Sequence, residues 1–182
     1  MSRWAPEPEV TASTDIITPF GTVRLAWLEE NVTKVQMAPF DFDPNRRTTI
    51  RRYMPPHENG QKMIAKMLSY FQGKEVDFEF TIPENMGTGF QRRVWMALKE
   101  IPYGSHETYG DLALRLDLPL QSARSVGNAC GQNPLPIIFP CHRVIASTGQ
   151  LTGYSAGVAW KKALLELEGV AIENDRIRTF RK

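Results

Sequence analysis

A run of turn-forming residues at positions 83–89 (PENMGTG) separates two stretches of the chain that have different hydrophobic patterns. Before this run apolar residues often alternate with polar ones, which is typical of half-buried strands, whereas after it they recur at the spacing of helices. One regular repeat therefore cannot describe the whole chain. We expect a mixed α/β (α+β) fold, with a small N-terminal α/β domain over residues 1–86 and a mostly helical C-terminal domain over residues 87–182.

The N-terminal stretch predicts strands first. Val23, Leu25 and Trp27 alternate with polar or small residues, so residues 16–37 are expected to form a short antiparallel hairpin. A loop that contains Pro44 follows.

A helix and a further strand complete the predicted N-terminal layer. Apolar residues recur at helical spacing over residues 63–71, and Gly73 is a natural stop for that helix. Residues 76–82 alternate between apolar and polar side chains and predict a half-buried strand.

The C-terminal stretch predicts two short helices joined tightly, as in a helix-turn-helix or winged-helix-like domain. Thr108 is a good N-cap for the first helix, and the second is expected to run from about Ser122 to Cys130. A last amphipathic helix is expected to end at Glu168, with Gly169 just beyond it.

Composition places the chain among ordinary globular proteins, since 42% of its 182 residues are hydrophobic and 23% are charged. No apolar run is long enough to span a membrane and no signal peptide is evident, so we expect a cytoplasmic protein, or a nuclear one in a eukaryote. Residues 1–86 hold 10 Lys and Arg against 12 Asp and Glu, and residues 87–182 hold 12 against 8. The second half is therefore the better candidate to bind an anionic partner.

The two cysteines, Cys130 and Cys141, are too few for a disulfide scaffold, and two of the three histidines lie far from them in sequence. We therefore expect no zinc site, and a thiol as the special group. His142 and Arg143 follow Cys141 directly, and such neighbours can favour the nucleophilic thiolate. Considered alone, a Cys-His pair is more often a small buried side chain beside a packed histidine.

The surrounding motifs decide between these interpretations. Residues 140–144 (PCHRV), with Asn133 and Pro134 before them and residues 153–155 (GYS) and 164–169 (LLELEG) after them, closely resemble the 6-O-alkylguanine-DNA alkyltransferases, or methylated-DNA–protein-cysteine methyltransferases. The resemblance covers about residues 87–170 and rests on several separated motifs in the same order. It implies direct-reversal DNA repair.

The resemblance implies a displacement chemistry in which the alkyl group moves from the guanine oxygen to the sulfur of Cys141. His142 would deprotonate the thiol through a water molecule, because neighbours on an extended segment point to opposite sides. Glu168 would hold the imidazole, and Asn133 would brace the turn around the site. A thioether product has no easy leaving group, so each molecule should react once. The implied reaction needs no metal and no organic cofactor.

The resemblance also implies a monomer that binds double-stranded DNA containing alkylated guanine through the minor groove and flips the damaged nucleotide out. Arg124 would fill the gap in the helix, and Tyr109 would rotate the phosphate and donate a hydrogen bond to the flipped base. The small residues implied to approach DNA beside Arg124 are Ser122, Ala123, Ser125 and Gly127.

The residues implied to line the alkylguanine pocket are Pro136, Val144, Tyr154, Ser155 and Ala156. Ala156 occupies a position where many members of the family have glycine, so its methyl group bears on the size of adduct accepted. Cys130 lies on the predicted recognition helix and faces the core by periodicity, so we interpret it as a packing residue rather than a second acceptor.

Two alternatives remain open at this stage. One is a lesion-binding sensor of the alkyltransferase-like class, in which the acceptor cysteine is replaced, although this chain has Cys141. The other is a cysteine hydrolase with a Cys-His-Glu set, which would turn over many times and would leave Tyr109 and Arg124 without a purpose.

Overall fold

The computed structural model describes residues 12–29, 31–52, 55 and 57–177, and the chain divides into two compact units, Met1–Val76 and Asp77–Lys182. The division falls after Val76 rather than after residue 86. Phe80 shows why, since its ring meets the ring of Phe139 in the second unit edge-on, with 5.9 Å between centroids. The segment after Val76 therefore packs with the helical unit. The two units are described separately.

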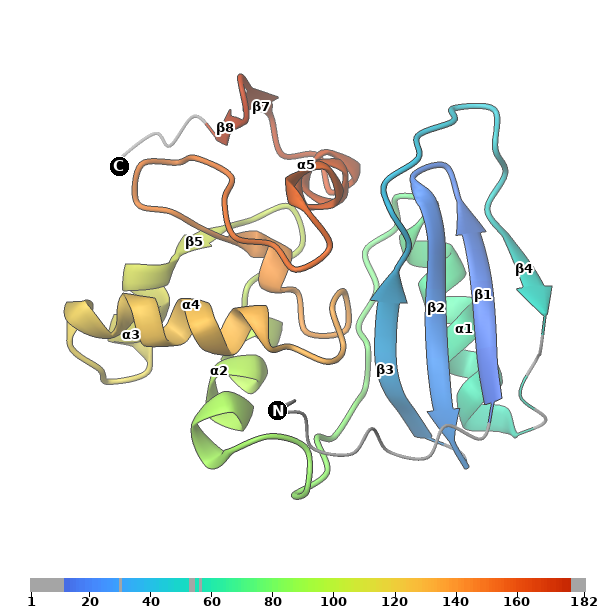
Figure 1. Cartoon of the computed structure of the whole chain (residues 1–182), viewed down its shortest axis with the longest axis horizontal. Helices are drawn as coiled ribbons and strands as arrows, with labels where there is room; N and C mark the ends of the chain where they lie inside the picture. The colour runs from blue at the N-terminus through green and yellow to red at the C-terminus, as the bar shows by residue number, and fades with distance from the viewer. Residues whose placement is uncertain (1–11, 30, 53–54, 56, 178–182) are drawn as a thin grey trace, which may run out of the picture. The chain divides into compact units, whose positions relative to one another are not determined.

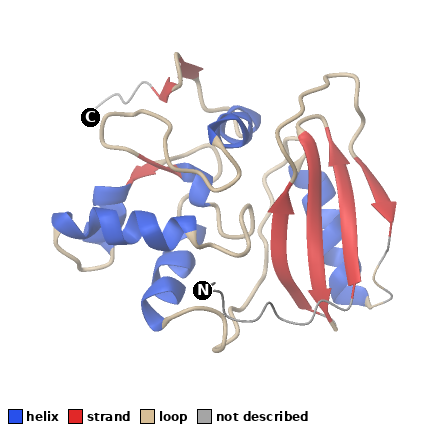
Figure 2. Cartoon of the chain, in the orientation of Figure 1, coloured by secondary structure: helices blue, strands red, loops and turns tan. Residues whose placement is uncertain are grey.

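The first unit contains a four-stranded antiparallel sheet with the order β3-β2-β1-β4 (Figures 1 and 2). Its strands are β1 (Ala12–Thr18), β2 (Gly21–Leu28), β3 (Asn31–Met37) and β4 (Thr49–Arg52). The hairpin expected over residues 16–37 is confirmed. The loop expected after it is wrong in part, because β4 lies there and pairs with β1. A four-residue edge strand with one apolar residue, Ile50, is too short for a periodic signal.

Helix α1 (Glu58–Tyr70) packs on this sheet and confirms the helix predicted there, with Gly73 beyond its end at a φ of 79°. The core consists of the buried apolar residues Ile16, Val23, Leu25, Trp27, Val35, Ile64 and Met67. The strand predicted over residues 76–82 is wrong, because these residues form no regular element and belong to no sheet. Alternation alone does not make a strand when no neighbouring strand is available for hydrogen bonds.

The second unit is mostly helical, as expected. Its helices are α2 (Gly89–Lys99), α3 (Tyr109–Arg115), α4 (Ala123–Gly131) and α5 (Val158–Leu167), with short 3₁₀ turns η1 (Leu120–Ser122) and η2 (Cys141–Arg143). Thr108 caps α3 through a reciprocal pair of contacts with Asp111, so the predicted cap is confirmed. The indole Nε1 of Trp95 donates to the carbonyl of Ala129 at 2.8 Å and ties α2 to α4.

A short parallel pairing determines how the helices meet the segment that contains Cys141. Strand β5 (Glu107–Thr108) pairs with β6 (Val144–Ile145), so the start of α3 lies beside the residues that follow η2. Strands β7 (Ile172–Glu173) and β8 (Arg176–Ile177) form a separate hairpin near the C-terminal end of the described chain. This register brings Tyr109, the first residue of α3, close to the Cys141 segment.

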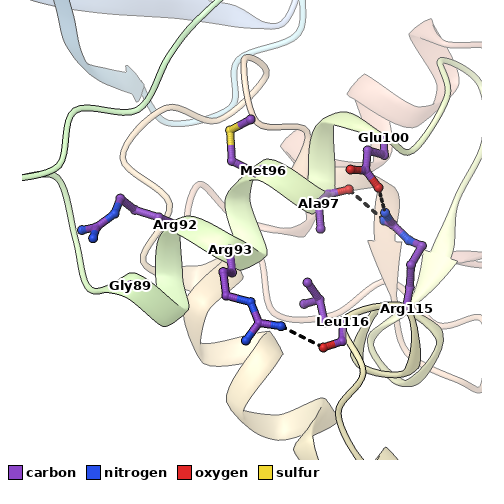
Figure 3. A pocket seen from close by; sticks show the side chains of 8 residues that line it. All are labelled: Gly89, Arg92, Arg93, Met96, Ala97, Glu100, Arg115 and Leu116. Atoms are coloured by element: carbon purple, nitrogen blue, oxygen red, sulfur yellow. Dashed lines mark hydrogen bonds and ion pairs between the residues drawn. The ribbon is translucent and has the colours of Figure 1, made fainter.

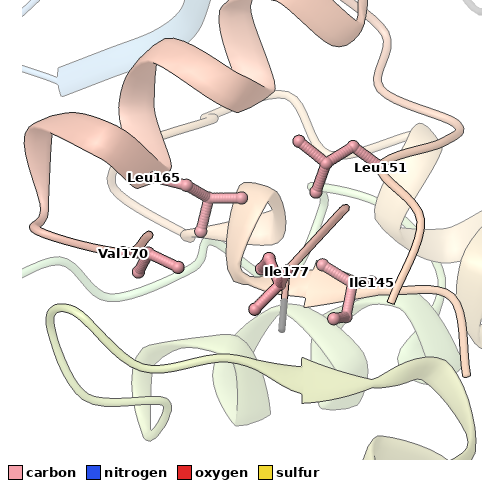
Figure 4. Close-up of a cluster of buried hydrophobic side chains, with 5 residues drawn as sticks. All are labelled: Ile145, Leu151, Leu165, Val170 and Ile177. Atoms are coloured by element: carbon pink, nitrogen blue, oxygen red, sulfur yellow. The ribbon is translucent and has the colours of Figure 1, made fainter. Parts of the chain in front are cut away.

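An apolar cluster packs beside this strand pairing (Figure 4). It consists of Ile145, Leu151, Leu165, Val170 and Ile177, all buried. The cluster joins β6, α5 and the terminal hairpin, so the backbone that carries the cysteine segment rests on a packed base. None of the helices in the described ranges is both long and apolar enough to cross a bilayer.

Candidate active site

Cys141 begins the 3₁₀ turn η2 and is 4% exposed. Its backbone N–H donates to the carbonyl of Phe139 at 2.7 Å. The expectation that Cys141 and His142 lie on an extended segment is therefore wrong, because the chain turns sharply after Pro140. The turn buries Cys141, His142 and Arg143 together.

The side-chain amide of Asn133 braces the loop that leads to this turn. Its Nδ2 donates to the carbonyl of Phe139 at 2.7 Å and to Sγ of Cys141 at 3.2 Å, while its Oδ1 accepts from the N–H of Leu135 at 3.0 Å. Within the braced loop Ile137 has a φ of 76°, a conformation that costs energy for a β-branched residue. Asn133 thus holds a strained loop and donates a hydrogen bond to the sulfur.

His142, Arg143 and Glu168 form a buried charged cluster. Nε2 of His142 lies 2.7 Å from Oε1 of Glu168, and the guanidinium of Arg143 donates to both carboxylate oxygens at 2.9 and 3.0 Å. Arg143 also donates to the carbonyl of Ile101 at 2.6 Å. Because Glu168 follows the last turn of α5, this cluster fixes α5 to the cysteine segment.

The electrostatics of the cluster give each group a definite state. Burial opposes the charge on Glu168, but hydrogen bonds and charges from His142 and Arg143 outweigh it and lower the pKa of Glu168 to about 2. Burial lowers the pKa of His142, so its imidazole is neutral near pH 7. Since Nε2 faces Glu168, Nδ1 is the nitrogen left to take a proton.

Burial also raises the pKa of the Cys141 thiol, whereas the hydrogen bond from Asn133 and the charge of Lys161 lower it. The thiol is therefore held in a site that needs added positive charge or hydrogen bonds to ionise.

Tyr109, at the start of α3, lies close to Gly127, Gly153 and Lys161. Its ring is close enough to α4 that a Cβ added at Gly127 would lie 3.7 Å from it, and a Cβ added at Gly153 would lie 3.9 Å from its hydroxyl. The ammonium of Lys161 lies 5.7 Å from the ring centroid. Burial raises the pKa of the Tyr109 hydroxyl, so it stays protonated and can donate a hydrogen bond.

The residues expected to meet DNA lie along α4 and the turn before it. Arg124 and Ser125 are exposed, and Ser122, Ala123 and Gly127 are half-buried. Since Arg124 is on the exposed face of α4, the position is compatible with the wedge that the sequence predicts.

The residues expected to line a substrate pocket differ in burial. Pro136, Val144 and Tyr154 are buried, Ala156 is half-buried and Ser155 is exposed. The N–H of Gly157 donates to the carbonyl of Tyr154 at 2.9 Å, which closes a turn that leads into α5. The roles assigned to these side chains stay predictions.

A different pocket, of about 450 Å³, lies along α2 and the end of α3 (Figure 3). It contains none of the predicted site residues; its lining is Gly89, Arg92, Arg93, Met96, Ala97, Glu100, Arg115 and Leu116. Its arginines are engaged within the unit: Arg93, for example, donates to the carbonyl of Leu116 at 3.0 Å. This pocket is not the place where the predicted residues gather.

Comparisons with known proteins agree with this geometry. A family model described as 6-O-methylguanine DNA methyltransferase, DNA binding domain, matches residues 89–170. Over 84% of this chain and 89% of its relative, the sequence is 39% identical to the methylated-DNA–protein-cysteine methyltransferase of Mycobacterium tuberculosis. The chain belongs to the methylated-DNA–protein-cysteine methyltransferase family. The family expected from the sequence motifs is confirmed.

Other members of the family extend the likeness. The Haemophilus influenzae member is 36% identical over 91% of this chain and 93% of its own. The crystal structure of Mycobacterium tuberculosis OGT in complex with DNA matches with a TM-score of 0.69 at 38% identity, over 86% of this chain and 92% of the other. The expected mixed fold, with a sheet unit and a helical unit, is confirmed.

Two features of this family member were missed in the sequence. Arg143 was expected to act on Cys141, yet its guanidinium contacts Glu168 instead. Lys161 was not singled out at all, although it is completely buried. A signal existed for Lys161, because it precedes the buried Leu164 and Leu165 by three and four residues and so falls on the inner face of α5.

Two expectations about this family member remain as they were. Within the described part of the chain, no group of three or more His, Cys, Asp or Glu side chains is arranged to hold a metal ion. The expectation that no metal or cofactor is needed stays a prediction. Cys130 is a buried free thiol on α4, which agrees with its interpretation as a packing residue.

Proposed function

We propose that this protein repairs DNA directly, by irreversible transfer of an alkyl group from the 6-oxygen of guanine, and less well from the 4-oxygen of thymine, to Cys141. The observation that carries this proposal is the hydrogen bond from the Asn133 amide to Sγ of Cys141. His142 follows Cys141 directly in the chain, and its imidazole is held by the ionised Glu168. A sulfur that accepts a hydrogen bond, with a base one residue away, is suited to nucleophilic attack.

The proposed reaction conserves atoms and charge. The proton of the Cys141 thiol passes through a water molecule to His142, and the thiolate forms a bond to the alkyl carbon as the bond from that carbon to the guanine oxygen breaks. The electron pair stays on the base, which takes a proton from the Tyr109 hydroxyl. Tyr109 is then reprotonated from His142, so the net change is one proton lost by the thiol and one gained by the restored guanine.

Reaching the lesion requires the nucleotide to leave the duplex, which costs a few kcal/mol of stacking and pairing. We propose that Arg124 fills the gap from the minor groove, and that the small residues beside it let α4 approach the DNA. Glycine at position 127 leaves α4 free of a side chain next to Tyr109. The protein acts as a monomer in the cytoplasm, or in the nucleus of a eukaryotic cell.

The test is a mass measurement after mixing the protein with excess duplex DNA that contains one 6-O-methylguanine. The proposal predicts one added methyl group, on the peptide that contains Cys141, and an equal amount of restored guanine. Cys141→Ser should abolish transfer but keep binding to the lesion. The matched control is Cys130→Ser, which should still transfer the methyl group.

The alternatives appear as distinct outcomes of the same experiment. Unmodified protein that stays bound to the lesion would identify a sensor. Unmodified protein that releases restored guanine repeatedly would identify a hydrolase. Methyl transfer to Cys130 would overturn the assignment of the acceptor.

A further inference from the structure

Lys161 is a buried charged residue that the proposed reaction does not yet use. It lies on the inner face of α5 and is 0% exposed. Trp160, Leu164 and Leu165 on the same helix are also buried, so its surroundings on α5 are apolar. Because an ammonium group loses strong hydration when it is buried, a lysine in this position needs compensation from the groups around it.

The hydrogen bonds of Lys161 do not supply an opposite charge. Its Nζ donates to the carbonyl of Val144 at 2.7 Å and to the carbonyl of Thr152 at 3.0 Å, and both acceptors are neutral. Considering the described residues alone, no carboxylate forms an ion pair with Nζ. Two neutral carbonyls leave the charge of the ammonium group uncompensated, so a nearby group that ionises would stabilise it.

The contacts of Lys161 place this cation against the cysteine segment. Val144 directly follows η2, the turn that begins with Cys141, and the ring of Tyr109 lies on another side of the ammonium. Cys130 on α4 is the second thiol in range. Burial lowers the pKa of Lys161 to about 8, while the charges of Cys141 and Cys130 work in the opposite direction.

Among these groups Cys141 is the one whose ionised form the chemistry requires. We propose that Lys161 is a positioning residue for the transfer reaction: its ammonium group is the counter-charge that stabilises the Cys141 thiolate from the moment His142 takes the thiol proton until the alkyl group is transferred. This inference rests on the proposed function for its purpose. Lys161 keeps its proton throughout, and alkylation turns the sulfur into a neutral thioether, so the ammonium loses its counter-charge when the reaction is complete.

Several other charged or titratable groups belong to the elements around Lys161 and bear on any pH measurement. They are Tyr109 on α3, Cys130 on α4, His142 and Arg143 on η2, Tyr154 in the loop before α5, and Glu168 at its end. Tyr109, Tyr154 and Cys130 have a pKa raised by burial, so they stay neutral near pH 7. Glu168 remains charged because its pKa is lowered. His142 is therefore the neighbour whose titration must be separated from that of Cys141.

The test measures the reaction of Cys141 with iodoacetamide as a function of pH, without DNA, by following the mass of the peptide that contains Cys141. In Lys161→Met the midpoint of reactivity should rise by about one pH unit or more, so that the rate at pH 7 falls about tenfold. The matched control is Lys162→Met, which removes the same charge from the next residue, where the side chain is 38% exposed. Its midpoint should equal that of the unmodified protein.

Lys161→Arg separates the effect of charge from that of shape, because it keeps a cation at this position. Its midpoint of reactivity should lie close to that of the unmodified protein. A folded Lys161→Met variant with an unchanged midpoint would overturn the proposal and leave Lys161 as a tie between two carbonyls. If Lys161→Met does not fold, the titration of Lys161 is followed by NMR in the original sequence, before and after methyl iodide has methylated Cys141. The pKa of Lys161 should fall after methylation, and an unchanged pKa would contradict the proposal.

These measurements use no DNA, so they are independent of the proposed function. A shifted midpoint together with no transfer from 6-O-methylguanine would contradict the function while supporting the charge pair. An unshifted midpoint with normal transfer would do the reverse.

Discussion

Each unit of the molecule contains an arginine–carboxylate pair, but the two pairs differ in their access to water. In the sheet unit Asp15 pairs with Arg24, whose side chain is 42% exposed. In the helical unit Glu168 pairs with Arg143, and their side chains are 0% and 10% exposed. An ion pair that reaches solvent adds modest stability. A buried pair loses hydration free energy when it forms, and removing one partner destabilises the protein strongly because the other charge stays buried.

This difference shows that the desolvation cost of buried charges is concentrated in the helical unit. The sheet unit has an apolar core between strands and helix, and its paired arginine reaches the surface. The helical unit buries Arg143, Lys161, His142 and Glu168 around one thiol. Charges in a protein interior are retained where a reaction needs fixed charge and a shifted pKa.

The largest expected effect comes from breaking the buried pair of Glu168 and Arg143. In Glu168→Gln, His142 loses its anionic partner and Arg143 is left as a buried charge without its carboxylate. We expect transfer from 6-O-methylguanine to slow about 100-fold and the free energy of unfolding to fall by about 3 kcal/mol. Single-turnover kinetics and urea unfolding measure the two effects.

Asp15→Asn is the matched change in the sheet unit. Because Arg24 remains solvated when its partner is neutralised, we expect a loss of about 1 kcal/mol of stability and an unchanged transfer rate. Equal losses of stability in the two variants would contradict the contrast between the pairs.

A second prediction concerns the donor to the sulfur. Asn133→Ala removes the hydrogen bond to Sγ of Cys141 and the brace of the loop that contains Ile137. Transfer should slow by about 30-fold or more, since removal of one preorganised donor in a buried site typically has an effect of this order. The exposed Asn128 on α4 supplies the control, and Asn128→Ala should transfer at the original rate.

How much could be predicted from the sequence differs between the two units. Helices α1, α3, α4 and α5 follow from apolar spacing and from caps such as Thr108, because these signals are local. Strand β4 and residues 76–82 were assigned wrongly, because strand formation depends on a partner elsewhere in the chain.

The site shows the same limit. The motifs predicted Cys141, His142, Asn133 and Glu168 through resemblance to a family. No local pattern indicates that Arg143 donates to Glu168 or that Lys161 donates to the carbonyl of Val144. Both contacts join residues at least 17 positions apart. They depend on how α5 packs against η2.

A third prediction separates DNA distortion from chemistry. Arg124→Ala should slow repair of duplex DNA about tenfold and leave transfer from the free base 6-O-methylguanine unchanged, because only the duplex requires a wedge. Arg47→Ala, an exposed arginine in the sheet unit, is the control for loss of one positive charge. Equal rates of duplex repair in the Arg124 variant and the original protein would remove Arg124 from the wedge role.

A last prediction concerns acid stability. The folded-state pKa of Glu168 is about 2, below its ordinary value of 4.5. A carboxyl with a depressed folded pKa stabilises the protein fully above its unfolded pKa, and that contribution is lost as pH falls through the folded pKa. The free energy of unfolding should therefore fall between about pH 4.5 and pH 2, by on the order of 1 kcal/mol per pKa unit.

Urea titrations at several pH values measure this dependence, and the same slope should be absent from Glu168→Gln. Asp15→Asn should retain it. A slope that survives in Glu168→Gln would assign the acid dependence to other carboxyl groups.

The central claim is that Cys141 is consumed as the acceptor, and the most direct test is the yield of repair at high lesion excess. A fixed amount of protein is mixed with increasing amounts of duplex DNA containing 6-O-methylguanine, and the restored guanine is counted at the end of the reaction. The account predicts a plateau at one guanine per protein molecule. A yield that keeps rising beyond one guanine per protein would contradict it.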